Sequence, residues 1–366
     1  MASGKRTASR KRRARRPTRR RRKKRPAPRW AGRGLKRLLD VRLCDLKLSI
    51  ERSPLAKCVK QIHRELARRD LRFRPYFWLS DDWFTPEGVT GTAIPFYLAH
   101  PRLVRLERSQ MGEAEGGTRA WCMKLLRHEV GHAIDHAYLL HRRRRWQQLF
   151  GISSRPYPRY YQPNPYSKRH VLHLEYWYAQ SHPDEDFAET FAVWLGSTRA
   201  HWRKRYRGWP AARRKLEYVD ELMAEISGTW PSVRTRTRMD SLSRIYKTLR
   251  QHYKARRRKY PRAHPDTYDR DLRTLFLALP KGRRRDRERA ESFIRRERAA
   301  LLRVLRPWTG EYRYPLEHVL KDMIGRCREL KLYVRASRPN LKRDLAIVLT
   351  KHTMDSLYKS RRWVEL

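Results

Sequence analysis

The string HEVGH at residues 128–132 places two imidazoles and a carboxylate in a spacing that suits a metal ion. In a helix, His128 and His132 lie on one face, about 6 Å apart along the axis, so both can reach one zinc ion at ~2.0–2.1 Å. Glu129 lies about 100° around the helix, where it can take a proton from a water molecule that zinc activates. The string predicts a zinc hydrolase. The alternative is a buried histidine pair with an incidental glutamate.

A catalytic zinc ion needs a third protein ligand. The metzincin pattern requires glycine at position 135 and histidine or aspartate at 138. This chain has Asp135 and Tyr138, which excludes that class. His136 and His141 follow on the same expected helix, but they have turned away from the ligand face. We expect them to be surface or supporting histidines.

Better candidates for the third ligand lie downstream in SHPDEDFAETFAVWLG, residues 181–196. Pro183 suits the first position of a helix, and Glu185 and Glu189, four residues apart, share one face of it. Carboxylates beside so many apolar residues are costly unless a cation or a hydrogen bond compensates. If one glutamate binds zinc and the other accepts a hydrogen bond from a ligand imidazole, the cost of burying both carboxylates is compensated. The alternative is an ordinary solvated acidic face.

Together, HEVGHAIDH and YAQSHPDEDFAETFAVWL resemble the putative zinc-binding metallopeptidases of bacteria, a group of gluzincin type. The arrangement is also similar to the catalytic domain of anthrax lethal factor, and the resemblance covers about residues 90–200. It implies a peptidase with a zincin-like core, one zinc ion per chain and a peptide or protein substrate. Carried over by position, it makes His128, His132 and Glu185 the zinc ligands, Glu129 the general base, Glu189 the partner of a ligand and Tyr178 the donor to the oxyanion. Glu189 is the substitute if Glu185 is not the ligand.

The elements that must position these residues include both helices and strands, which predicts an α+β fold with a small mixed sheet and an active-site helix. Alternating or aromatic-rich segments predict strands at 41–50, 71–80 and 91–107. Apolar residues at helical spacing predict helices at 54–69, 118–145, 167–179, 183–195 and 211–227. In zincin-like folds, an extended substrate pairs with the edge strand that precedes the metal helix. We expect that strand within 91–107.

The charge is unevenly distributed and predicts three regions. Residues 1–34 hold 17 Lys+Arg and no Asp+Glu, which predicts a disordered basic tail. Residues 35–230 form the expected metallopeptidase domain. Residues 231–366 hold 38 Lys+Arg and 15 Asp+Glu and predict a basic all-α domain with helices at 240–256, 266–279, 286–305, 315–332 and 339–357.

The net charge of +52 favours nonspecific contact with nucleic acid or another polyanion through 1–34 and 231–366. The alternative is that the charge only keeps the protein in solution. Apolar runs are too short to cross a bilayer, and four scattered cysteines without a CxxC pair are typical of a reduced, intracellular protein. We therefore expect a cytoplasmic protein without membrane contact, associated with the nucleoid if its ends bind nucleic acid.

Two functions fit these observations. The first is a zinc-dependent metallopeptidase. The second is a non-enzymatic polyanion-binding protein whose metallopeptidase core is structural or vestigial. Glu129 separates them, because a structural zinc site has no need of a carboxylate at that position.

Overall fold

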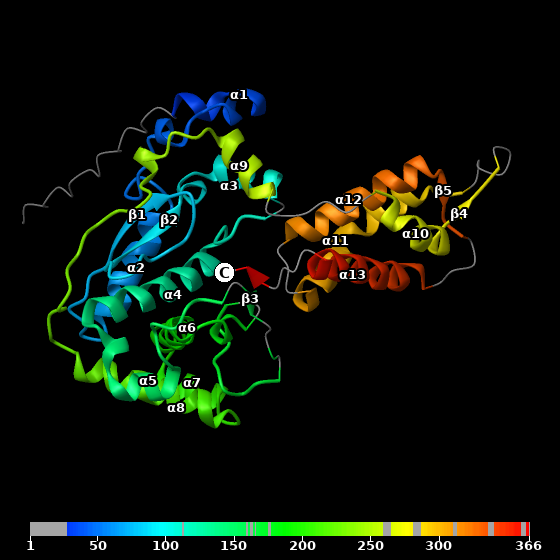
Figure 1. Ribbon diagram of the computed structural model, residues 1–366. Coiled ribbons are helices and arrows are strands. Elements are labelled where there is room, and N and C mark those ends of the chain that lie inside the picture. Colours follow the sequence, from blue (N-terminus) through cyan, green and yellow to red (C-terminus); the bar gives the residue numbers. More distant parts are fainter. Residues whose placement is uncertain are drawn as a thin grey trace, which may run out of the picture.

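The computed structural model describes residues 28–111, 113–158, 160–161, 164, 166–174, 177–258, 265–280, 287–309, 313–335, 340–359 and 364–365. Helices predominate over short strands in these residues (Figure 1), so the fold is of the α+β class. Most of the expected tail, residues 1–27, lies outside the described chain. Its remaining part is ordered near Trp30, whose buried indole donates to Leu46 O at 3.0 Å.

The α-helices are α1 (Leu35–Leu39), α2 (Leu55–Ala67), α3 (Pro101–Met111), α4 (Arg119–Tyr138), α5 (Arg144–Phe150), α6 (Pro183–Gly196), α7 (Arg199–Arg205), α8 (Pro210–Glu225), α9 (Leu249–Arg258), α10 (Asp269–Leu275), α11 (Ala290–Thr309), α12 (Arg313–Glu329) and α13 (Leu341–Lys359). The 3₁₀ turns are η1 (Arg29–Gly32), η2 (Leu43–Leu46), η3 (Phe96–Ala99), η4 (Leu140–Arg142), η5 (Tyr178–Gln180), η6 (Leu242–Arg244) and η7 (Pro265–Tyr268). The strands are β1 (Tyr76–Ser80), β2 (Gly91–Pro95), β3 (Tyr160–Tyr161), β4 (Leu277–Ala278), β5 (Leu332–Tyr333) and β6 (Val364–Glu365). None of the described helices is both long and apolar enough to cross a membrane.

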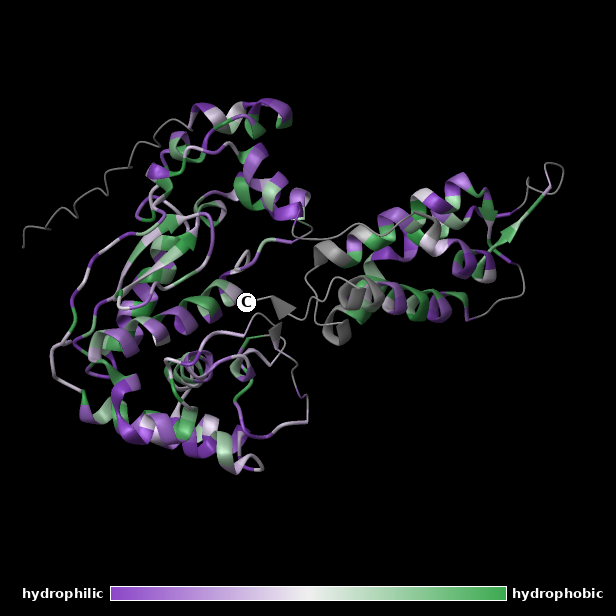
Figure 2. Ribbon diagram, in the orientation of Figure 1, coloured by the Kyte–Doolittle hydropathy of each residue, from purple (hydrophilic) through white to green (hydrophobic). Residues whose placement is uncertain are grey.

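The sheet beside the candidate site is small. Strands β1 and β2 run parallel, with Tyr76 opposite Gly91 and Ser80 opposite Pro95. Phe84 adds an antiparallel bridge to Ala93 of β2. Every residue of β2 is buried, and both strands are predominantly hydrophobic in Figure 2. Two further antiparallel pairs join β3 to β6 and β4 to β5.

The described residues form two large hydrophobic cores. The first runs from Trp30 to Tyr253 and includes the packed faces of α2, α4, α6 and α8. The second runs from Tyr268, at the end of η7, to Leu349 of α13. Leu249 and Tyr253 of α9 belong to the first core. We therefore propose that the basic helical unit begins after α9 and not at residue 231.

Several expected helices are confirmed. Helix α2 buries Leu55, Cys58, Ile62 and Leu66 at helical spacing. Thr118 caps α4, since its hydroxyl accepts from the backbone N–H of Trp121 at 3.2 Å. Helices α6 and α8 each begin at a proline, a residue whose missing N–H costs nothing in the first helical turn.

Other expected elements are wrong. The segment 41–50 is not a strand, because its buried Leu43 and Leu46 lie three residues apart on the turn η2. The segment 91–107 is a strand only to Pro95, and Pro101 starts helix α3. Proline therefore marks a helix start at 101, where the sequence suggested a bend in a strand.

One expected helix ends early, and the helix expected at 167–179 is wrong. Helix α4 stops at Tyr138 because Leu139 adopts a left-handed backbone with φ of 53°. The described part of 167–179 is irregular until Tyr178 opens η5, and Trp177 before it has φ of 54°. The backbone N–H of Leu174 is used by the side chain of Glu189 instead of a helical carbonyl.

Candidate metal centre

Helices α4 and α6 pack closely where their candidate ligands face one another. A Cβ atom added to Gly131 would lie 2.8 Å from Cα and 3.0 Å from O of Ala188. Only a residue without a side chain leaves room for this approach. The glycine of HEVGH thus brings the histidine face of α4 against the glutamate face of α6.

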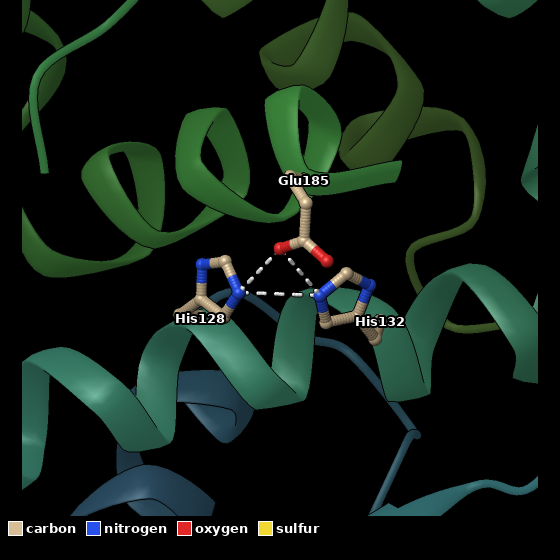
Figure 3. Close-up of side chains that lie close together, drawn as sticks. All are labelled: His128, His132 and Glu185. Atoms are coloured by element: carbon tan, nitrogen blue, oxygen red, sulfur yellow. Dashed lines mark hydrogen bonds and ion pairs between the residues drawn. The ribbon is translucent and has the colours of Figure 1, made fainter. Parts of the chain in front are cut away.

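Three side-chain atoms converge between the helices (Figure 3). Nε2 of His128 lies 2.9 Å from Oε2 of Glu185, and Nε2 of His132 lies 3.2 Å from the same oxygen. The two Nε2 atoms are 3.2 Å apart. His128 and Glu185 are buried and His132 is partly buried, so this group is shielded from bulk water.

Glu189 supports the group from one turn further along α6. Its Oε1 accepts from Nδ1 of His128 at 2.9 Å, and its Oε2 accepts from the N–H of Leu174 at 2.8 Å. A carboxylate accepts only, so this network assigns the ring proton of neutral His128 to Nδ1. Its Nε2 is then left with a free lone pair directed at Glu185.

This donor set fits a zinc ion. Nε2 of His128 and Oε2 of Glu185 lie 2.9 Å apart, and their lone pairs repel unless a proton or a metal ion lies between them. A cation placed among the three atoms removes that repulsion, and two imidazoles with one carboxylate are an established ligand set for catalytic zinc. His128, His132 and Glu185 are also the group of potential metal ligands that the described residues contain.

The pKa values follow from the same contacts. Burial lowers the pKa of His128, but hydrogen bonds to Glu185 and Glu189 outweigh it and raise that pKa well above its ordinary value. Burial raises the pKa of Glu185, but the attraction of His132 and the hydrogen bonds from both histidines hold it below the usual range. The site therefore favours negative oxygen atoms and a positive partner among them.

Glu129 lies beside this group and does not belong to it. The hydroxyl of Thr85 donates to Oε2 of Glu129 at 2.8 Å and is 2.9 Å from the hydroxyl of Thr92. Burial raises the pKa of Glu129, and the charges of His128 and His132 oppose that rise. A carboxylate with a raised pKa is better matched to exchanging protons near neutral pH.

The structure also locates Tyr178, the residue expected to donate to an oxyanion. Its ring lies 5.6 Å from the ring of His128 and 6.4 Å from that of Tyr161, measured between centroids. The sequence-derived residues are therefore brought together at one place, although their catalytic roles stay predictions.

Sequence reasoning missed Tyr157. Its hydroxyl donates to Oε1 of Glu185 at 3.1 Å, while Oε2 of that carboxylate faces the histidines. The Tyr157 ring stacks on His182 at 3.7 Å, and Nε2 of His182 bonds to Arg155 O at 2.7 Å. These contacts hold the loop before β3 on the first turn of α6, where it orients the candidate ligand.

Thr85 was also missed, and neither residue has a periodic signal that could reveal it. Tyr157 lies in a Pro- and Tyr-rich loop, and Thr85 precedes Pro86 in a turn.

The neighbouring acids and histidines have structural contacts. Asp186 is buried and pairs with Lys215 of α8. Nδ1 of His141 lies 2.7 Å from Oδ2 of Asp135, and Nδ1 of His136 lies 3.2 Å from Val89 O. These pairs fix α4 and α6 within the core and lie outside the ligand group.

Residues 103–221 match the model of a family described as "Putative zinc-binding metallo-peptidase". No curated protein and no solved structure shows a significant match to the chain. The matched span contains α4 and α6, and with them every candidate ligand. Over residues 103–221 the chain is similar to the putative zinc-binding metallo-peptidases, which confirms the resemblance drawn from its two motifs.

Proposed function

We propose that the protein is a zinc-dependent metallopeptidase with a zincin-like core. The observation that supports this most is the convergence of His128, His132 and Glu185 beside a buried Glu129. A structural zinc site would need the three ligands but not the carboxylate of Glu129. The family match over residues 103–221 supports the same chemistry independently of the geometry.

One zinc ion per chain, held by His128, His132 and Glu185, would supply Lewis acidity and lower the pKa of a water molecule. Glu129 accepts the proton of the attacking water and later donates it to the leaving amine. Thr85 keeps Oε2 of Glu129 in place for this transfer. Glu189 fixes the ring of His128, and Tyr178 donates to the oxyanion that develops on the substrate.

An extended substrate would align beside Glu129. The expected strand within 91–107 is wrong for this role, because β2 has β1 on one side and the bridge from Phe84 on the other. The segment 82–85 is the better candidate, since Thr85 touches the general base and Phe84 continues the sheet. We propose that the substrate backbone pairs along this segment.

The decisive experiment combines zinc analysis with peptide hydrolysis. The wild type should hold one zinc ion per chain, and His132→Ala should lose it. Glu129→Gln should retain zinc and lose hydrolysis by about 10²-fold or more, whereas Glu221→Gln, an exposed site on α8, should behave as wild type. Full hydrolysis by Glu129→Gln would contradict the mechanism.

The basic ends support a second part of the proposal. Residues 1–34 and 231–366 carry most of the net charge, and we propose that they hold the enzyme on nucleic acid without sequence preference. With the cysteine usage, this favours action in the cytoplasm at the nucleoid. Zinc retention without any hydrolysis by the wild type would instead favour the non-enzymatic polyanion-binding function.

A further inference from the structure

The segment 229–240, which connects α8 to α9, is an exposed extended strap. It is the long yellow-green trace on the left of Figure 1, outside β1 and β2. Side chains of β1, and of Thr90 just before β2, hold its backbone by four hydrogen bonds: Thr90 to Thr235 O at 2.8 Å, Tyr76 to Thr237 O at 2.6 Å, Trp78 to Met239 O at 2.8 Å and Ser80 to Asp240 O at 2.6 Å. The strap is therefore fixed although it has no regular secondary structure.

This strap presents arginine at alternate positions. Arg234, Arg236 and Arg238 are all exposed. Residues two apart in an extended chain lie on the same side, about 6.6 Å apart. Because the backbone is already held, three guanidinium groups are presented in a row with little further loss of main-chain entropy on binding.

An exposed tryptophan lies at the start of this row. Trp230 is 62% exposed, and the guanidinium carbons of Arg72 and Arg234 lie 5.5 and 5.3 Å from its ring centroid. Arg74 is exposed two residues after Arg72, while the apolar residues between and beside them are buried. Two segments far apart in sequence thus contribute to one surface.

We call Arg72, Arg74, Trp230, Arg234, Arg236 and Arg238 the arginine face. Within the described residues, no salt bridge engages any of its five arginines. Other arginines of the same unit are neutralised by acids, such as Arg127 by Glu65 at 2.9 Å. The arginine face therefore keeps its positive charge available to a partner.

We propose that the arginine face binds single-stranded nucleic acid, with phosphates along the row of arginines and a base stacked on Trp230. A fixed row of cations beside an aromatic ring is the combination that single strands use, because every base has a face to stack. An acidic polypeptide would use the charges but offers no base to stack on the exposed indole. This inference rests on the polyanion part of the proposed function and not on the metal centre.

The test measures binding of a labelled oligothymidylate to the full chain at several salt concentrations. Arg234→Gln/Arg236→Gln/Arg238→Gln should reduce the salt slope by about 2, since each single-strand phosphate contact contributes about 0.7. Lys204→Gln/Arg207→Gln/Arg214→Gln removes the same charge from exposed residues of α7, of α8 and of the turn between them, and should reduce the slope by less than about 0.7. Equal losses in the two triple variants would overturn the proposal.

Tryptophan variants test the stacking. Trp230→Ala should weaken binding roughly 5- to 150-fold, and Trp230→Phe should retain most of the affinity. Unchanged binding of oligothymidylate by Trp230→Ala would overturn the assignment to nucleic acid. So would a loss of binding to polyglutamate, an acidic polypeptide, that equals the loss of oligothymidylate binding in the arginine triple variant. Zinc content and peptide hydrolysis should be unchanged in all variants. If the wild type binds oligothymidylate but hydrolyses no peptide, the proposed peptidase activity is refuted and the proposed nucleic-acid surface is not affected.

Discussion

Gly131→Ala is the smallest change that tests how the candidate metal centre is built. The added Cβ would lie 2.8 Å from Cα of Ala188 and 3.2 Å from its Cβ. Non-bonded carbon atoms prefer at least about 3.5 Å, so α4 and α6 must separate by about 0.7 Å at this point. His128 and His132 move with α4, while Glu185 stays with α6.

The magnitude follows from two opposing effects. Overpacking typically costs 1–3 kcal/mol, whereas replacing glycine within a helix by alanine returns about 0.8–1.0 kcal/mol. The protein should therefore lose at most about 2 kcal/mol of stability. Zinc affinity should fall much further, by more than about 100-fold, because ligand distances tolerate changes of only about 0.2 Å.

Zinc affinity is measured by competition with a chromophoric chelator, and stability by thermal melting of the zinc-free protein. Gly325→Ala provides the matched control, since a Cβ there meets no atom within 4 Å and should leave zinc affinity unchanged. Wild-type zinc affinity in Gly131→Ala would refute the idea that this contact sets the separation of the ligands.

Three further changes have separate readouts. Glu185→Ala should weaken zinc binding more than Glu189→Ala, whose loss should be about 10–100-fold; the reverse order in chelator titrations would make Glu189 the ligand. Burial lowers the pKa of His252 to about 3, so the unfolded chain takes up a proton below about pH 6.5 and the folded chain does not. This histidine alone should thus contribute a loss of about 2 kcal/mol of stability between pH 7 and pH 5, and the stability of His252→Gln should depend less on pH by that amount in urea titrations; an identical pH dependence in the variant would contradict the assignment. Deleting residues 1–27, which leaves the buried Trp30 in place, should flatten the salt dependence of DNA binding and weaken it on all sequences alike, while peptide hydrolysis continues; unchanged affinity in a gel shift would exclude the tail as an attachment.

The candidate site could be predicted from the sequence to the extent that it is set by helical periodicity. Residues four apart share a face of any helix, so His128 with His132 and Glu185 with Glu189 were predictable as pairs. That the two faces meet depends on the contact between Gly131 and Ala188, which joins elements far apart in the chain. Periodicity does not predict that the two faces meet, whereas the resemblance of the two motifs to a known family does.

The contacts from loops could not be predicted in this way. Tyr157 reaches Glu185 across 28 residues and Thr85 reaches Glu129 across 44. Neither lies in a repeating pattern, because loop positions are set by tertiary contacts. The strand predicted at 41–50 is wrong for a different reason. Its apolar residues alternate in the sequence as in a strand, but two leucines three residues apart are buried on a 3₁₀ turn.

The buried charges explain why these loop contacts matter. Glu185, Glu189 and Glu129 lie within one poorly hydrated region between α4 and α6, where an uncompensated carboxylate costs several kcal/mol. The imidazole of His128 offsets two of them, and a divalent cation would offset them more fully. Tyr157 and Thr85 each donate to a carboxylate oxygen that the histidines do not reach. Each hydroxyl therefore lowers the cost of burying its carboxylate and limits its rotation, so the same bond serves both stability and the geometry of the site.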